Sequence, residues 1–269
     1  ISNNNPHSLS FDGVDDWVEI NNPITFERVT IDLEFEYYDE TDGIIIGKID
    51  TGVNSSFYLA MNPSNQDGYR RLRSSVKTAA MPSNNVDWYI DTDAVLEEGE
   101  RYRLTFIYDE ISVKVYIDEN LMINSAVPIS GPLSQTNIPV RIGRQGNGNA
   151  YFYGLVDNIR VWNEAIDING LEENDEFLVM DYGSNAGSGT TLYDHSGNGN
   201  HGTIHGANWV ENIYGCTDEL ACNYDSLANI SDDSCDYSCH DNGDYSLSFD
   251  GMDNYVEIDN NFYLDNSFT

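Results

Sequence analysis

Short segments in which apolar and polar residues alternate occupy most of residues 7–210. In residues 29–37 an apolar residue takes every second position, and threonine or acidic residues take the positions between them. This period of two predicts a half-buried antiparallel strand. The same pattern recurs in residues 101–108 and 112–118, on either side of a turn at Asp109-Glu110, and predicts a hairpin.

Roughly a dozen such segments are separated by turns rich in Gly, Asn and Asp, as in all-β domains. Long helical periodicities are absent, and tyrosine is abundant, with 18 residues. We therefore predict an all-β fold in which two antiparallel sheets pack face to face.

A repeat divides the chain into parts. Residues 8–20, SLSFDGVDDWVEI, recur with three changes as residues 246–258, SLSFDGMDNYVEI. A repeat of this length indicates a duplicated module. We predict a domain at 1–212, a Cys- and Asp-rich connector at 213–243, and the first strands of a second, truncated domain at 244–269.

The chain is strongly acidic, with 12 Lys and Arg against 46 Asp and Glu. Every Lys and Arg lies between Arg28 and Arg160. Such a field disfavours nucleic acid and anionic membrane surfaces as partners. Loop carboxylates suit divalent cations, although an acidic surface also serves solubility alone, and we expect both at different residues.

No apolar run is long enough to span a membrane, so we predict no membrane insertion.

The four cysteines cluster between Cys216 and Cys239, in a segment without an apolar core-forming run. An even number in such a segment predicts disulfides and an oxidising compartment. We expect a piece of a larger secreted or cell-surface protein. The spacing alone leaves three pairings open.

One basic patch interrupts the acidic sequence and provides candidate ligand-binding residues. Arg70, Arg71 and Arg73 follow Tyr69, and Trp88 comes shortly afterwards. Because Arg binds planar oxyanions through two hydrogen bonds, one interpretation is a site for a uronic acid, sulfate or sialic acid. The alternative is that these arginines neutralise neighbouring carboxylates.

Three motifs carry a resemblance to a known family. They are Ser8–Gly13, Gly154–Trp162, and the Asp194-x-Ser-Gly-Asn-Gly-Asn sequence that precedes Trp209. About residues 7–211 resemble the laminin-G-like, concanavalin-A-like jelly-roll domains of large secreted bacterial proteins, many of them from Bacteroidetes. The resemblance implies a jelly-roll sandwich and a non-catalytic adhesion or carbohydrate-binding module. Its partners would be a glycan or a surface protein, and neighbouring modules of the same chain.

The resemblance also implies Ca²⁺ where the first and last strands of a sheet meet. The corresponding ligands are Asp12, the carbonyl of Gly13, and Asp157. The alternative is that Asp12 only forms a turn and Asp157 faces solvent. Asp157 interrupts an apolar strand, and an unpaired buried carboxylate is costly, which favours the metal.

The connector resembles a short Gly-Cys-Thr-Asp repeat of the same secreted proteins. This resemblance implies that Cys216 pairs with Cys235, and Cys222 with Cys239. Its aspartates are expected either to share a Ca²⁺ or to form an acidic spacer that the disulfides hold. These aspartates are Asp218, Asp225, Asp232 and Asp233.

Two other functions compete with binding. Asp32, Glu34 and Glu36 share one strand face, and a retaining glycosidase needs two carboxyls about 5–5.5 Å apart. The strand lacks the Glu-x-Asp-x-x-Glu spacing of laminarinase-like enzymes, so we predict no catalysis. The other alternative is a structural bead of an extracellular filament or stalk, with the connector as a stiff joint.

Overall fold

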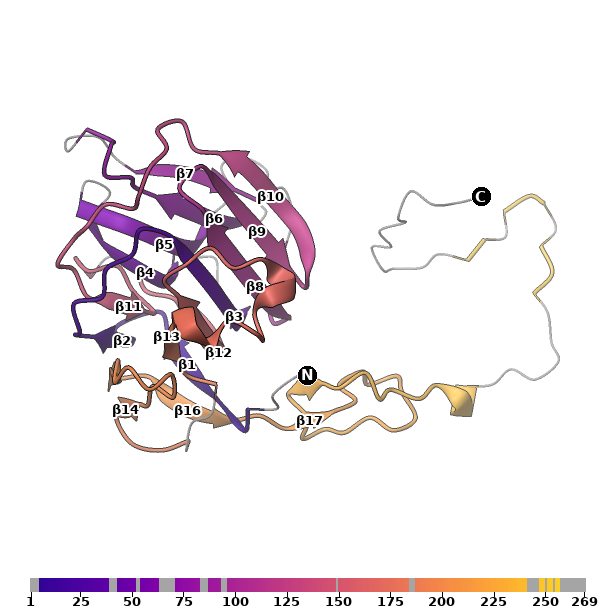
Figure 1. Cartoon of the computed structure of the whole chain (residues 1–269). Coiled ribbons are helices and arrows are strands. Elements are labelled where there is room, and N and C mark those ends of the chain that lie inside the picture. Colours follow the sequence, from indigo (N-terminus) through magenta and orange to yellow (C-terminus); the bar gives the residue numbers. More distant parts are fainter. Residues whose placement is uncertain are drawn as a thin grey trace.

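The alternating segments form the strands of two antiparallel eight-stranded sheets, which pack face to face as a jelly-roll sandwich (Figure 1). This confirms the predicted all-β class. The computed structural model describes residues 5–38, 43–51, 54–62, 71–82, 87–92, 96–148, 150–183, 187–240, 247–249, 251–253 and 255–256.

The first sheet has the strand order β10-β9-β8-β3-β12-β1-β16, and β13 also pairs with β12. Its strands are β1 (His7–Asp12), β3 (Val29–Tyr37), β8 (Arg101–Tyr108), β9 (Ser112–Ile117), β10 (Asn120–Ala126), β12 (Tyr153–Trp162), β13 (Leu178–Asp181) and β16 (Asn208–Glu211). Because β1 lies between β12 and β16, the two ends of the jelly roll meet in this sheet.

The second sheet has the order β14-β15-β2-β11-β4-β5-β6-β7. Its strands are β2 (Trp17–Ile20), β4 (Gly43–Thr51), β5 (Asn54–Asn62), β6 (Arg71–Val76), β7 (Trp88–Asp91), β11 (Val140–Ile142), β14 (Thr191–Leu192) and β15 (Gly202–His205). The described residues also form three short 3-10 helices: η1 (Ile168–Gly170), η2 (Asp175–Phe177) and η3 (Ser238–His240).

The core lies between the sheets, and β3 shows how the sequence builds it. Ile31, Leu33 and Phe35 are at most 1% exposed and pack into the core. The residues between them place carboxylates on the outer face of the first sheet. The predicted alternation of faces is therefore confirmed, and it decides which face carries charge. The strand is not half-buried as predicted: Thr30, Asp32 and Glu36 on its polar face are at most 8% exposed.

The connector follows β16 and forms a narrow arm beyond it (Figure 1). It holds a parallel pair of short strands, β17 (Tyr214–Gly215) and β18 (Ile230–Ser231). Disulfides join Cys216 to Cys235 and Cys222 to Cys239, which is the pairing that the resemblance implied.

The described residues of the second repeat copy form no strand. Leu247 and Phe249 are 75% and 54% exposed, whereas the equivalent Leu9 and Phe11 of the first copy are 3% and 0% exposed. Most of the predicted second domain lies outside the described residues. Among the residues that the structure describes, no helix has the length and apolarity that a bilayer crossing requires.

Candidate functional site

A cleft of about 1070 Å³ lies between the outer face of the first sheet and the connector. We call it the module–connector cleft. Its sheet side is lined by Glu34, Glu36, Gly99, Glu100, Arg101, Arg103 and Asp118, and its connector side by Tyr214, Thr217, Ala228, Asn229, Ile230, Ser231, Asp232 and Asp233. Nearly all of these residues can hydrogen-bond through side chains, so the cleft suits a polar ligand.

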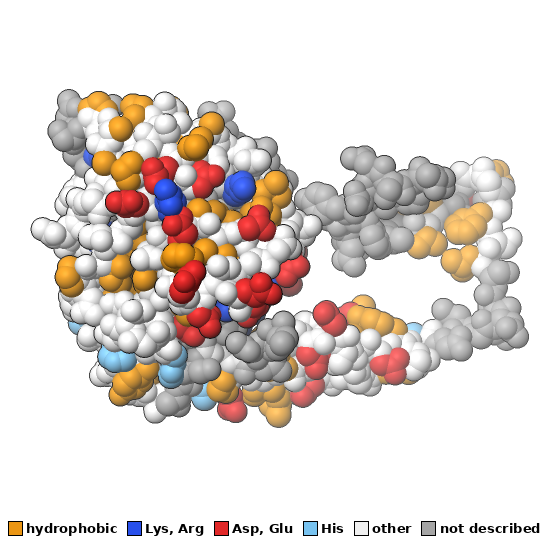
Figure 2. Space-filling view, viewed as in Figure 1, with side chains coloured by type: hydrophobic (Ala, Val, Ile, Leu, Met, Phe, Trp, Pro, Cys, Tyr) orange, Lys and Arg blue, Asp and Glu red, His pale blue; other side chains and the backbone are white. Residues whose placement is uncertain are grey.

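Strand register explains why arginines and carboxylates meet on this face. Glu34 of β3 lies opposite Arg103 of β8, and Glu36 lies opposite Arg101. Side chains directly opposite one another in an antiparallel pair share a face of the sheet. Figure 2 shows Asp and Glu side chains interspersed with Lys and Arg on this side of the module.

Groups of the module occupy most donors of both cleft arginines. Every guanidinium nitrogen of Arg103 contacts a carboxylate, whereas Nη2 of Arg101 donates to the Ser8 hydroxyl and its buried Nε has no partner among the described residues. Arg101 Nη1 lies 3.3 Å from a carboxylate oxygen of Glu34 and 3.3 Å from one of Asp157. Arg103 Nε and Nη2 each lie 3.1 Å from an oxygen of Asp32, and Nη1 lies 3.2 Å from Glu119. The guanidinium groups therefore have little capacity left for an anionic ligand.

Two carboxyls of the cleft, those of Glu36 and Asp118, have raised pKa values. Burial raises the pKa of Glu36, although a hydrogen bond from Tyr38 acts in the opposite direction. Burial also raises the pKa of Asp118, and the charges of Glu34 and Glu119 raise it further. Six carboxyl groups and two guanidinium groups line the cleft. Its field is therefore negative, which favours neutral or cationic ligands.

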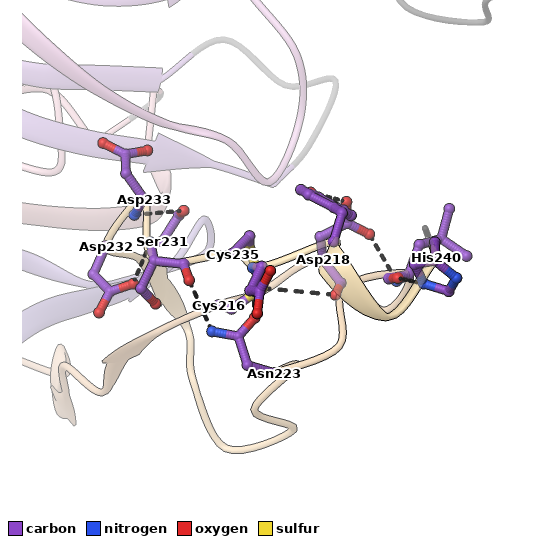
Figure 3. Close-up of a disulfide and its surroundings, with 12 residues drawn as sticks. Cys216, Asp218, Asn223, Ser231, Asp232, Asp233, Cys235 and His240 are labelled. Atoms are coloured by element: carbon purple, nitrogen blue, oxygen red, sulfur yellow. Dashed lines mark hydrogen bonds between the residues drawn. A yellow bond between two sulfur atoms is a disulfide. The ribbon is translucent and has the colours of Figure 1, made fainter. Parts of the chain in front are cut away.

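Hydrogen bonds to the module position the connector wall. The hydroxyl of Tyr214 donates to the carbonyl of Asn5 at 3.3 Å, and the amide of Asn229 donates to the carbonyl of Glu211 at 2.9 Å. The Cys216–Cys235 disulfide braces the segment that carries Asp232 and Asp233 (Figure 3). The cleft therefore depends on a folded connector.

The structure does not bring the predicted calcium ligands Asp12, Gly13 and Asp157 together. In the β1–β12 ladder Asp12 lies opposite Tyr153, four positions along the strand from Asp157. Gly13 also lies against Tyr153, because a Cβ on it would come within 2.9 Å of the Tyr153 Cβ. The strand register therefore separates the turn from Asp157, and the three residues do not form the predicted common calcium site.

Asp157 instead ties the two ends of the module together. Its carboxylate accepts hydrogen bonds from the Asn5 amide at 2.5 Å, the Ser8 hydroxyl at 3.1 Å and the Asn212 amide at 2.7 Å. Burial raises its pKa, while the charge of Arg101, the backbone N–H of Asn158 and the Asn212 amide act in the opposite direction. The sequence correctly indicated a buried, partnered carboxylate, but the partners are an arginine and neutral donors.

A different carboxylate cluster forms at the Asp-Gly turn. Carboxylate oxygens of Asp12, Asp15 and Asp16 lie within 4.8 Å of one another. Asp16 is 4% exposed, and its pKa is raised by burial and by the charges of Asp12 and Asp15. A hard cation would relieve this repulsion, so the donor set fits Ca²⁺. Sequence reasoning missed Asp15 and Asp16, although the repeat carries an acid or its amide at the same positions, Asp253 and Asn254.

The four connector aspartates do not converge on a common site. Asp218, Asp225 and Asp232 each accept a hydrogen bond from the backbone N–H two residues further on, at 2.8, 3.0 and 3.0 Å. Within the described residues, Asp233 joins none of them in a cluster of three acids. Each of these three carboxylates stabilises its own Asx turn, and this is why they lie apart along the connector. Figure 3 shows Asp218 and Asp232 at different places along the connector.

The predicted anion-binding patch is internally neutralised where it is described. Arg73 makes two hydrogen bonds to Asp91, at 2.7 and 2.9 Å, and its guanidinium stacks 3.9 Å from the ring centre of Tyr89. Arg71 donates to the carbonyl of Thr92 at 3.2 Å. Trp88 is half-buried and packs against the core. For Arg73 the geometry is that of the charge-neutralising alternative, whereas the bond described for Arg71 goes to a neutral carbonyl.

Two further predicted ligand residues, Tyr69 and Arg70, lie outside the described residues.

The carboxylates that prompted the enzyme hypothesis have separate partners. Asp32 accepts from Arg103 and from the Thr105 hydroxyl, the latter at 2.7 Å. Glu34 accepts from Arg101 at 3.3 Å and from the amide of Asn158 at 3.0 Å. Both carboxylates therefore accept hydrogen bonds from side chains of neighbouring strands of the first sheet.

Comparison with known proteins places this geometry in a family. Residues 12–168 match the laminin G 3 family of the concanavalin A-like lectin/glucanases superfamily. No curated protein matches the chain closely enough to count as a relative. Among solved structures, a candidate carbohydrate-binding protein from Bacteroides ovatus superposes with a TM-score of 0.59 at 18% identity, covering 77% of this chain and 60% of that one.

Two other structures are more distant. The Limulus polyphemus SAP-like pentraxin has a TM-score of 0.45 at 17% identity and covers 62% of this chain and 80% of its own. The CBM40 of the Ruminococcus gnavus IT-sialidase, bound to α2,3-sialyllactose, has a TM-score of 0.47 at 11% identity and covers 61% and 95%. The family match covers more than half of the sequence, and the chain belongs to the laminin G 3 family of the concanavalin A-like lectin/glucanases superfamily.

Proposed function

We propose that the protein is a non-catalytic carbohydrate-binding module of a secreted, multi-module surface protein, and that it holds a glycan in the module–connector cleft. The cleft itself carries the proposal. Carboxylates and amides hydrogen-bond to sugar hydroxyls, and the ring of Tyr214 offers an apolar surface for the C–H face of a sugar. The fold shared with the Bacteroides ovatus protein and the two disulfides support a carbohydrate-binding, extracellular role.

The charge of the cleft narrows the class of glycan. Arg101 and Arg103 already bind protein carboxylates, and the lining has an excess of acids. A uronic acid or sialic acid would meet repulsion without a free guanidinium to offset it. Neutral or amine-bearing glycans are therefore the expected ligands of this cleft.

Asp118→Asn should weaken binding of a neutral or amine-bearing oligosaccharide by about tenfold, because an amide replaces a charged acceptor. The substitution keeps the size of the side chain and a carbonyl oxygen for its bond to the Arg103 N–H, 2.8 Å long. Calorimetric titration of glycans found on an array measures the effect. Glu176→Gln, an exposed change of the same charge outside the cleft, is the control. Preferential binding of anionic glycans, or unchanged affinity in Asp118→Asn, would contradict the proposal.

The proposal includes a structural Ca²⁺ at the turn of Asp12, Asp15 and Asp16. When bound, the ion would neutralise converging carboxylates and fix the turn between β1 and β2. Asp12 also accepts the N–H of Val14 at 2.8 Å, which holds the turn without an ion. The ion would therefore stabilise the module without contributing to the cleft.

Calcium should raise the melting temperature at neutral pH by roughly 5–10 °C when it exceeds its Kd about 100-fold. Because the pKa of Asp16 is raised in the folded state, ionisation of Asp16 without a cation costs stability as pH rises through that pKa. The calcium effect should thus disappear below about pH 4 and grow toward neutrality. Calorimetry with calcium or EDTA measures it, and Asp16→Asn should diminish it. Equal melting curves at neutral pH would exclude the ion.

A rigid spacer is the second candidate function. Two disulfides within the connector, and its hydrogen bonds to Asn5 and Glu211, favour a stiff joint between modules. A glycan array without hits, together with calcium-dependent melting, would favour the spacer over the carbohydrate-binding module.

A further inference from the structure

β10 is the outermost strand of the first sheet, and no strand of the described residues lies beyond it (Figure 1). The N–H of Val127, directly after β10, donates to the carbonyl of Ile111 at 2.8 Å, on the β9 side. Hydrogen bonds of an antiparallel ladder alternate along a strand, so the N–H and C=O groups of Asn124 and Ala126 point away from β9. β10 therefore presents backbone donors and acceptors that can pair with a further strand.

The surface around β10 is uncharged, although the molecule is strongly acidic. Residues 120–140 contain no Asp, Glu, Lys or Arg, and no other stretch of the sequence is uncharged for as long. All residues of β10 except Ile123 and Ser125 are exposed. Because the net charge is −34, two copies of the chain repel each other over most of their surfaces. The edge formed by β10 is where two copies can approach with the least repulsion.

The other outermost strands offer less to a pairing strand. β16 and β7 have four residues each and include an acid, Glu211 and Asp91 respectively, and β14 has only two residues. Proteins protect free edges by charge, by brevity or by a bulge. β10 has a bulge between Leu121 and Ile123, but its ladder from Ile123 to Ala126 is regular. This regular part of the edge is open for pairing.

Exposed apolar side chains lie at both ends of β10. Leu121 and Met122 are near its start, Ile111 and Ile129 lie close to its end, and all four are exposed. A strand that pairs antiparallel with a copy of itself brings the start of each strand beside the end of the other. Such pairing places apolar side chains against apolar side chains and hydrogen-bonds the polar middle of the strand. The edge is therefore complementary to itself.

We propose that β10 pairs antiparallel with β10 of a second copy of the chain, about a two-fold axis near Ser125, and joins two modules edge to edge. Side chains opposite one another in antiparallel strands share a face of the sheet. The outer faces of the two first sheets, and with them the two module–connector clefts, then point the same way. The pairing does not depend on glycan binding. If the cleft binds a glycan as proposed above, the dimer holds a polymeric glycan with greater avidity than one module does.

Sedimentation equilibrium of the full chain, from about 10 μM to about 1 mM, measures the pairing. Dimer should form at the higher concentrations. It should increase between about 0.1 M and about 1 M NaCl, because the Debye length falls from about 10 Å to about 3 Å and screens the repulsion. Asn124→Pro removes an outward N–H and keeps the ladder with β9, and Asn124→Lys places a charge on the edge. Each should weaken self-association by about tenfold or more, with little change in melting temperature.

Asn208→Lys, an exposed change on β16 at the opposite edge of the same sheet, is the matched control and should dimerise like the unchanged chain. Both Lys variants change the net charge equally, so only the position differs. A chain that stays monomeric at about 1 mM in about 1 M NaCl would overturn the proposal. Dimers that persist in Asn124→Lys, or that are lost in Asn208→Lys, would overturn it too. Dimerisation without any glycan binding would contradict the function proposed for the cleft and leave the pairing of β10 standing.

Discussion

Arg101→Met should destabilise the module by about 3–5 kcal/mol at neutral pH, the cost of leaving a buried charge without its partner. Asp157 has a side chain that is only 2% exposed, and Arg101 is its cationic partner. The substitution also removes the 2.8 Å hydrogen bond from Arg101 to the Ser8 hydroxyl. Urea unfolding, followed by tryptophan fluorescence, measures the free energy of unfolding.

The pH dependence makes this prediction specific. Burial already raises the pKa of Asp157, and loss of Arg101 removes the largest opposing effect, so the pKa should rise further. A raised folded-state pKa means that stability is lost as pH rises through it. The penalty of Arg101→Met should therefore shrink as pH falls through this raised pKa, because the carboxyl then takes up its proton. A penalty that is independent of pH would show that lost packing, and not the buried charge, dominates.

Arg28→Met provides the control for a lost ion pair. Arg28 contacts Glu110 and Glu164, but its side chain is 40% exposed. Exposed pairs contribute about 1 kcal/mol or less. The contrast between two Arg→Met changes then isolates the effect of burial. Adding Asp157→Asn to Arg101→Met should restore part of the stability, because the uncompensated charge is gone.

Replacing Cys216 and Cys235 by Ser should unfold the connector, leave the module folded, and weaken glycan binding in the cleft at least tenfold. The connector has few buried apolar residues of its own, such as Ala221 and Ile230, at 8% exposure each. Segments shorter than about 40 residues rarely fold without disulfides or metals. The bond closes a loop of 19 residues, which contributes about 3 kcal/mol.

Limited proteolysis and glycan titration measure the two consequences separately. Cleavage should occur within the connector while the module resists, and its melting temperature should change little. The matched control replaces Cys222 and Cys239. They are further along the chain from the lining residues Thr217 and Asp233 than Cys216 and Cys235 are, so their loss should affect binding less. Full retention of binding after loss of Cys216–Cys235 would mean that the connector wall does not contribute to the site.

The alternating pattern of β3 predicted which face of the strand carries its carboxylates, but not which arginines pair with them. Asp32, Glu34 and Glu36 were placed on one face because a strand alternates its side chains whatever its neighbours are. Their arginine partners could not be predicted, because pairing depends on which strands lie beside β3 and in which register. For the same reason the sequence indicated that Asp157 is partnered, yet assigned it to a metal with Asp12.

Sequence alone determined the all-β class, the inward and outward faces of strands such as β3, and a cysteine-rich connector. Those features follow from period-two burial and from composition, which are local properties of the chain. Only the tertiary structure decided that Arg101 binds Asp157, that Asp12 meets Asp15 and Asp16, and that the connector forms one wall of a cleft. The first and last of these depend on strand order and on how the connector docks, which bring together residues that are distant in the sequence. The aspartate cluster depends on the conformation of the turn between β1 and β2, which the period-two pattern does not specify.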